Sequence, residues 1–214
     1  MWSRAAVVVG VMLLSGPSWA ELTWSTWDSG PGHNYHQYAI YWQAGTWPEA
    51  YAFARAQDAY LVTVLSAEEE AWLMSAFPSE WTQNTWMGLT DSEGYRGEES
   101  HGFGWPDRRW RGWVWLEDGV PVPLTPGSYM NWDPGCQEPN NAENGEDFGA
   151  LNWWSTGKWN DWDVGHIDTP SSEWDKWPLR AILERNPVPE PSSLTLLAVA
   201  VAAGGVLKLR RRRK

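Results

Sequence analysis

The chain has 214 residues, of which 27 are acidic and 16 basic, for a formal net charge of −11. All 27 acidic residues but only nine basic ones lie between positions 21 and 190, so this segment carries a net charge of −18. So acidic a surface repels nucleic acid and anionic lipid, and we expect no nucleic-acid partner.

Residues 1–20 have the pattern of a secretory signal peptide. Arg4 supplies a positive charge, an apolar run follows from Ala5 to Leu14, and Ser18 and Ala20 place small residues at the expected cleavage positions. The run is shorter than the roughly 20 apolar residues that span a bilayer, which argues against a permanent anchor here. We therefore expect export.

The segment from 21 to 186 is long enough for one domain with its own core. It contains 18 of the 20 tryptophans of the chain. Tryptophan buries a large apolar area, so we expect most of these to be core or strand residues. A minority would be free to stack on sugar rings.

The first predicted elements are a strand and a helix. Residues 37–43 alternate in polarity, which is typical of a half-buried strand. Pro48 and Glu49 follow Trp47 as a helix start, since proline and an acidic residue are favoured in the first turn. The helical spacing ends near Asp58.

A second helix and three further strands follow. Ser66 and Glu69 have the spacing of a capping box, which predicts a helix from there to about Phe77. Residues 61–64, 86–89 and 179–184 are apolar runs that predict short strands. Two segments rich in glycine or charge, 92–112 and 163–178, are predicted to be inserted loops.

Five side chains between positions 138 and 161 carry oxygen atoms of the kind that bind calcium: Glu138, Asn140, Glu146, Asn160 and Asp161. Calcium takes about 6–8 oxygen ligands from carboxylates, amides and backbone carbonyls. The set has no histidine or cysteine, which argues against zinc or copper. Magnesium is less suited, because it keeps its waters and uses few protein ligands. The pattern favours Ca²⁺ as the cofactor.

These motifs resemble those of C-type lectin domains. Residues 138–140 and 159–161 match the family's Glu-Pro-Asn and Trp-Asn-Asp elements, and residues 86–89, 113–119 and 129–132 resemble other family motifs in the same order. The resemblance covers about residues 38–185. It implies an α+β fold, in which two helices flank a small mixed sheet and long loops bind calcium.

The resemblance also implies roles for the five residues. Glu138, Asn140, Glu146 and Asn160 would each bind calcium and hydrogen-bond sugar hydroxyls, while Asp161 would bind the ion. The peptide bond before Pro139 would be cis. The order Glu-Pro-Asn goes with mannose-type sugars in this family, so mannose, N-acetylglucosamine, glucose or fucose is the expected partner rather than galactose. A second calcium ion is implied at Asp91, Glu93, Asn141 and Asp147.

The sequence departs from the family at its cysteines. Ala54 and Leu183 stand at one expected cysteine pair, and Phe148 and Val164 at the other, so we expect apolar packing in place of disulfides. Cys136 has no partner in the chain, which makes it a tolerated loop residue or a site of intermolecular pairing.

Residues 187–214 resemble a PEP-CTERM sorting tail of Gram-negative bacteria. Val188 to Ser192 carries the motif, an apolar segment runs from Leu194 to Leu209, and Arg210 to Lys214 is basic. The resemblance implies processing by an exosortase after transient anchoring in the inner membrane. The protein would then be at the cell surface or in the extracellular matrix. A plain single-span anchor is the alternative.

Parts of the sequence suggest three interpretations other than carbohydrate binding: an enzyme, a protein-binding module and a histidine metal site. A glycoside hydrolase would need two carboxylates on either side of a glycosidic bond, whereas these acids cluster as metal ligands, so we predict no enzyme. A lectin-like module that binds protein or matrix, with calcium only ordering its loops, stays open because one fold carries many functions. His33 and His36 are spaced three apart, but no third metal ligand is evident.

Overall fold

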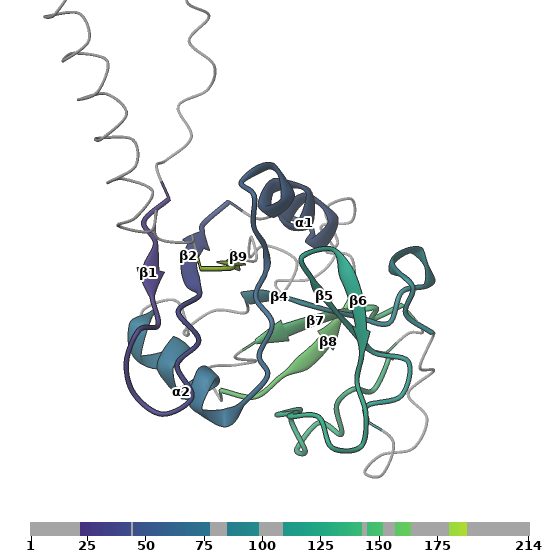
Figure 1. Ribbon diagram of the computed structural model, residues 1–214. Coiled ribbons are helices and arrows are strands. Elements are labelled where there is room, and N and C mark those ends of the chain that lie inside the picture. The colour runs from purple at the N-terminus through teal and green to yellow at the C-terminus, as the bar shows by residue number, and fades with distance from the viewer. Residues whose placement is uncertain are drawn as a thin grey trace, which may run out of the picture.

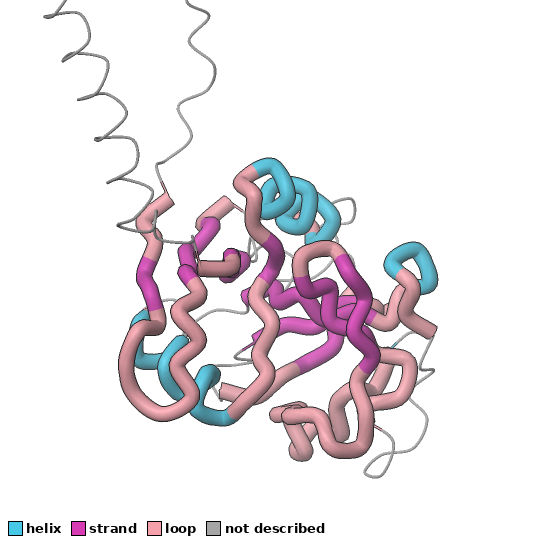
Figure 2. Tube along the Cα trace, viewed as in Figure 1, coloured by secondary structure: helices cyan, strands magenta, loops and turns pink. Residues whose placement is uncertain are grey.

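The computed structural model describes residues 22–43, 45–77, 85–98, 109–142, 145–151, 157–163 and 180–187. Figure 1 shows two helices at opposite ends of a twisted sheet. Figure 2 shows that much of the described chain lies in loops between the strands.

Both predicted helices are present. Helix α1 spans Trp47–Ala56, and Thr46 and Glu49 form a reciprocal capping box at its start. Helix α2 spans Ala67–Ala76, and the Ser66 hydroxyl accepts a hydrogen bond from the Glu69 amide. A full capping box would also have the Glu69 carboxylate accept from the Ser66 amide. It accepts from the amide of the preceding residue, Leu65, instead. Glu69 is buried, and its other oxygen binds Tyr38, so the core determines where its carboxylate lies.

The strands form one mixed sheet in the order β1-β2-β9-β4-β5-β6. Strands β3 and β7 extend it, because β3 pairs with β9 and β7 pairs with both β4 and β8. The pairing of β4 with β9 is parallel and the other pairings are antiparallel. The strand bounds are β1 Ser25–Thr26, β2 Gln37–Tyr41, β3 Tyr60–Leu61, β4 Thr85–Thr90, β5 Val114–Glu117, β6 Val120–Pro123, β7 Phe148–Leu151, β8 Asn160–Trp162 and β9 Arg180–Arg185.

The four strands predicted from apolar or alternating runs correspond to β2, β3, β4 and β9. Strand β3 is shorter than predicted, because Val62 leaves the ladder after its amide bonds the Ile182 carbonyl. A 3₁₀ turn over Glu93–Tyr95 occupies the start of the predicted 92–112 insertion. Residues 99–108 of that insertion, and all but Asp163 of the second one, lie outside the described residues.

The core divides into two clusters on either side of the sheet. One packs α1 against the sheet through Trp47, Trp86 and Phe148, and it contains both Ala54 and Leu183. Ala54 and Leu183, which stand where the family would have one pair of cysteines, are therefore buried in the same cluster. The other cluster contains several tryptophans, among them Trp113, Trp132 and Trp159, and Trp159 directly precedes β8. Phe148 is buried as expected, while its expected partner Val164 lies outside the described residues.

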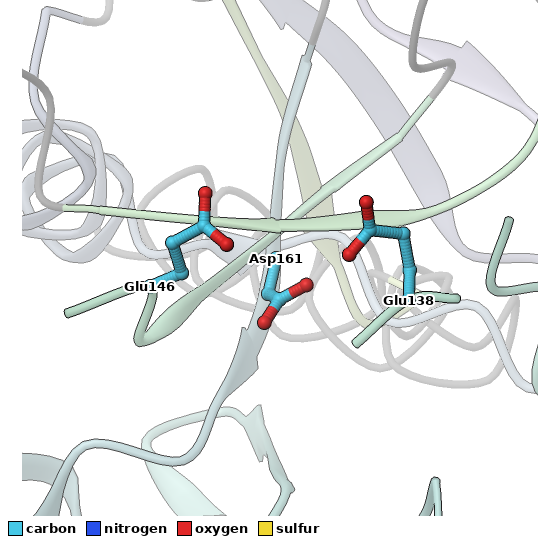
Figure 3. Close-up of side chains that lie close together, drawn as sticks. All are labelled: Glu138, Glu146 and Asp161. Carbon is cyan, nitrogen blue, oxygen red and sulfur yellow. The ribbon is translucent and has the colours of Figure 1, made fainter. Parts of the chain in front are cut away.

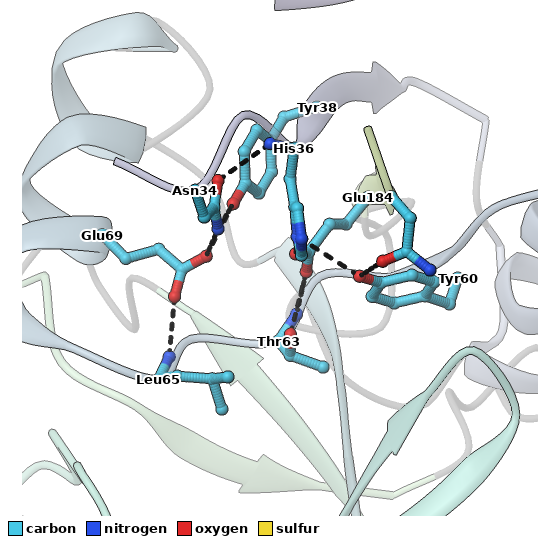
Figure 4. A network of polar contacts seen from close by, with 9 residues as sticks. Asn34, His36, Tyr38, Tyr60, Thr63, Leu65, Glu69 and Glu184 are labelled. Atoms are coloured by element: carbon cyan, nitrogen blue, oxygen red, sulfur yellow. Dashed lines mark hydrogen bonds and ion pairs between the residues drawn. The ribbon is translucent and has the colours of Figure 1, made fainter. Parts of the chain in front are cut away.

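A polar network crosses the sheet beneath α2. Glu184 of β9 accepts hydrogen bonds from the Thr63 amide and hydroxyl, at 2.8 and 2.9 Å, and it forms an ion pair with His36. Glu69 of α2 accepts from Tyr38 at 2.7 Å and lies next to Asn34 (Figure 4). His36 is thus a partner of a buried carboxylate, while the His33 ring contacts Gly30 and Tyr35.

The predicted signal peptide and sorting tail lie outside the described residues. Among the helices of the described part, neither is both long and apolar enough to cross a membrane.

Candidate calcium site

The predicted ligands are brought together from two parts of the chain. Glu138 and Asn140 lie in the long loop between β6 and β7, and Glu146 lies just before β7. Asn160 and Asp161 belong to β8, which pairs with β7 in a register that places Asp161 opposite Gly149. The Glu138–Pro139 peptide bond is cis, as predicted.

Asp161 of β8 connects the loop between β6 and β7 to the sheet through hydrogen bonds. Its two carboxylate oxygens accept hydrogen bonds from the backbone amides of Asn140, at 3.0 Å, and Asn141, at 2.7 Å. Asn141 in turn accepts from the Glu146 amide at 3.1 Å, and the Glu146 carboxylate accepts from the Ala142 amide at 2.7 Å. The loop is therefore folded back on itself around the acidic side chains.

Three carboxylates converge at this point. One oxygen each from Glu138, Glu146 and Asp161 lies within 4.8 Å of the other two, and Figure 3 shows the three side chains facing one another. Glu138 and Asp161 are buried, and Glu146 is partly exposed. Like charges this close repel one another, and a divalent cation would relieve the repulsion.

Two buried oxygens have no hydrogen-bond donor: Oε2 of Glu138, which belongs to this cluster, and Oδ1 of Asn160, the residue before Asp161. Each of these residues is only 2% exposed. The Asn160 amide nitrogen donates to the Asp161 carbonyl, and its side-chain oxygen can only accept. Buried acceptors without donors are costly unless a cation occupies the position of the donor. The residues therefore fit a calcium ion, which binds through oxygen atoms of this kind.

The electrostatics of the cluster agree with that fit. Burial raises the pKa of Glu138 to about 10, and the hydrogen bond to Asp161 and the charges of Asp161 and Glu146 add to the effect. Burial also raises the pKa of Asp161, against the lowering effect of its hydrogen bonds from Glu138 and the backbone. At neutral pH the cluster thus requires either a proton or a cation.

Asn140 differs from the other four residues in being exposed. Its backbone amide donates to Asp161, so an exposed residue lies directly beside a buried carboxylate. An exposed amide beside buried ligands is suited to contact a second molecule, because it carries both a donor and an acceptor.

The predicted second ion has weaker geometry. The Asp91 amide donates to the Asp147 carbonyl at 3.2 Å, so these two residues are neighbours. Glu93 is exposed, and Asn141 is engaged with Glu146. In the part of the chain that the structure describes, only Glu138, Glu146 and Asp161 form a cluster of three convergent carboxylates. The second site stays a prediction.

Two features near the site were not foreseen from the sequence. The buried strands β7 and β8 carry or flank the ligands, yet each has only three or four residues, too few to show a period. Glu70 of α2 is buried as well and accepts a hydrogen bond from the Trp159 indole nitrogen at 3.0 Å. Cys136 is an exposed free thiol in the loop between β6 and β7 that also carries Glu138.

Known proteins share parts of this sequence and fold. Over 132 residues, or 59% of the chain, the sequence is 28% identical to human C-type lectin domain family 10 member A. The fold is that of a C-type lectin-like domain. The matched part makes up 34% of that human protein, so the chain spans about a third of its length. Herring type II antifreeze protein is 16% identical, with a TM-score of 0.50 over 76% of this chain and 97% of that one.

The chain also matches the carbohydrate-recognition domain of mouse scavenger receptor C-type lectin. That match has 28% identity and a TM-score of 0.47, and it covers 72% of this chain and 92% of the other. Residues 187–213 match the PEP-CTERM protein-sorting motif, which implies exosortase-dependent export. The sequence match and the fold thus both resemble C-type lectin domains, and the C-terminal match adds a sorting motif.

Proposed function

We propose that this chain is an exported, calcium-dependent carbohydrate-binding protein with mannose-type specificity. The observation that carries the proposal is the group of convergent carboxylates together with two buried oxygens that have no donor, on Glu138 and Asn160. Calcium would be held by Glu138, Asn140, Glu146, Asn160 and Asp161. When bound, the ion supplies a positive charge that sugar hydroxyls can share.

The same residues would orient the sugar. With the cation bound, the ionised carboxylate of Glu138 would accept hydrogen bonds only, whereas the Asn140 amide also donates. A pair of neighbouring hydroxyls beside the ion would therefore donate to Glu138 and accept from Asn140. On the opposite side of the ion, Glu146 and Asn160 would likewise bind calcium and form hydrogen bonds with the sugar hydroxyls. Partly exposed Glu146 and exposed Asn140 leave this side of the cluster open to a ligand.

An alternative is a lectin-like module that binds protein or matrix while calcium only orders the loops. It stays open because one fold carries many functions. The two functions differ in whether free monosaccharides compete for binding.

A glycan array read with calcium and with a chelator tests the proposal. We expect mannose-, N-acetylglucosamine-, glucose- or fucose-bearing glycans to bind only with calcium. Asp161→Ala, which removes a ligand and the anchor of the loop, serves as the negative control. Calcium binding without any glycan signal would favour the protein-binding alternative.

A further inference from the structure

We infer that Glu70 of α2 is a positioning residue for the calcium site, aligning the two ligand-bearing segments from outside the ligand set. The inference rests on the proposed calcium site. It concerns a side chain that contacts none of the five ligands and lies on a different element of the fold.

Glu70 is the meeting point of three hydrogen bonds. Its Oε1 accepts from the Trp159 indole nitrogen at 3.0 Å, and its Oε2 accepts from the Asn131 amide nitrogen at 2.9 Å and from the Tyr129 hydroxyl. Glu70 is 3% exposed, so water cannot substitute for these donors. A buried carboxylate with three donors fixes the orientation of each group that binds it.

All three donors belong to the segments that carry the ligands. Trp159 directly precedes Asn160 and Asp161 in the chain. Its carbonyl accepts from the Asp133 amide at 2.8 Å, and the Asp133 carbonyl accepts from the Glu138 amide at 2.9 Å. A continuous series of hydrogen bonds thus leads from Glu70 through Trp159 to the backbone of Glu138.

Asn131 strengthens the same alignment. Besides Glu70, its amide nitrogen binds the Gly157 carbonyl at 2.9 Å, its side-chain oxygen accepts from Lys158 at 2.6 Å, and its backbone carbonyl accepts from the Trp159 amide at 2.9 Å. The segment before β8 is therefore held against the start of the long loop, with Glu70 at the centre. Calcium requires its ligands at defined distances, so a small shift between these segments lowers the affinity.

The adjacent residue offers a matched control. Glu69 is also 3% exposed and lies on the same helix, but its carboxylate binds Tyr38 and the Leu65 amide (Figure 4). None of its hydrogen-bond partners belongs to the segments that carry the calcium ligands. A substitution at Glu69 disturbs a buried carboxylate of α2 without touching Trp159, Asn131 or Tyr129.

The test is calorimetric titration of calcium into the full chain, comparing wild type, Glu70→Gln and Glu69→Gln. The Gln amide presents a donor where Glu70 presents an acceptor, so at least one of the three donors loses its partner. We expect Glu70→Gln to weaken calcium binding by roughly 10-fold, the low end of the effect of removing a group bound directly to a ligand, because Glu70 acts through Trp159. Glu69→Gln is expected to bind calcium like wild type, even where thermal unfolding in chelator shows that it is destabilised.

Tyr129→Phe provides a milder variant that removes one donor and keeps the aromatic ring. We expect it to weaken calcium binding in the wild-type background and to have little further effect in Glu70→Gln, because both changes act on one contact. The inference about Glu70 would be wrong if folded Glu70→Gln and Glu69→Gln bound calcium with equal affinity, or if Tyr129→Phe bound it like wild type. Either result would leave the proposed calcium site intact. No calcium binding by wild type would overturn the proposed function together with this inference.

Discussion

The Oδ1 atom of Asp161 lies 3.0 Å from the backbone nitrogen of Asn140 and accepts its hydrogen bond. The contact joins β8 to the loop residue that would face a sugar, across 21 positions of the chain. One proposed ligand thus positions another through the backbone. Because the same carboxylate also anchors the Asn141 amide, ion binding and loop folding are expected to be coupled.

Calcium should therefore stabilise the domain against heat. A ligand that binds only the native state at 100 times its dissociation constant adds about 2.7 kcal/mol to the free energy of unfolding. For a domain of this size, that corresponds to about 5–10 °C in the melting temperature. Thermal scans with EDTA and with excess calcium measure the shift. Identical midpoints would contradict the metal assignment, and Asp161→Ala should show no shift.

Helices and the central strands were predictable because their signals are local. Pro48 and Glu49 mark the start of α1, Ser66 marks that of α2, and the apolar run at 86–89 lies within the fully buried strand β4. The five proposed ligands were recognised through motifs. Three of them converge as carboxylates and a fourth, Asn160, has a buried side-chain oxygen without a donor.

The burial of Glu69 and Glu70 was not predictable. They belong to a run of three glutamates, and such a run resembles a solvated helix face. Their partners, Tyr38 and Trp159, are 31 and 89 positions away, so only the tertiary fold shows that both carboxylates are satisfied in the interior. Strands β7 and β8 were missed for a related reason: their pairing is long-range and their length is minimal.

Stability should fall as the pH rises from about 5 to 7 because of Glu69. Burial, followed by the charge of Glu184, raises its pKa to about 7, so the folded state holds this proton more tightly than the unfolded state does. The contribution is fully present below the usual glutamate pKa and is lost as the pH rises through about 7. The hydrogen bond to Glu184 raises the pKa of His36, which has the same sign.

Melting temperatures of metal-free protein from pH 5 to pH 8 check this prediction. Wild type should lose stability over that interval, with a share from Glu69 of no more than about 3 kcal/mol. Glu69→Gln carries a neutral side chain at every pH and should show a shallower decline. Parallel curves for the two proteins would rule out Glu69 as the titrating group.

Gly88 is expected to tolerate no side chain. A Cβ atom there would lie 2.5 Å from the Leu61 carbonyl oxygen, in the backbone of β3. Overpacking of this kind costs typically about 1–3 kcal/mol, so Gly88→Ala should lower the free energy of unfolding by that amount. Gly94→Ala is the control, because its nearest heavy atom would be the Ser92 hydroxyl at 3.6 Å. Chemical denaturation of both variants measures the difference.

The sorting tail should be absent from the mature protein. Residues 187–213 match a motif that exosortases process, and the apolar segment and basic cluster lie within and just beyond it. Intact mass of the protein recovered outside its native host should lack residues 1–20 and everything after roughly Glu190. Recovery of peptides from 194–214 in the extracellular form would instead indicate a permanent anchor.

Sugar preference should follow the chemistry of Glu138 and Asn140. Glu138 can only accept hydrogen bonds and Asn140 can donate, so the sugar must present one donating and one accepting hydroxyl in that order. Mannose, glucose and N-acetylglucosamine carry adjacent equatorial 3- and 4-hydroxyls that can do so beside the ion, and fucose offers its equatorial 2- and 3-hydroxyls. We therefore expect mannose, N-acetylglucosamine, glucose or fucose to compete for glycan binding better than galactose.

Each single-sugar contact should be weak, because Asn140 is exposed and few atoms are desolvated. Asn140→Asp replaces the donor with a second acceptor and should abolish the preference while calcium still binds. Asn160→Ala and Asp161→Ala should abolish sugar binding even with calcium present. Competition assays with each monosaccharide on wild type and the three variants measure these effects. Stronger competition by galactose, in protein that binds calcium normally, would show that the Glu138–Asn140 order does not set the specificity.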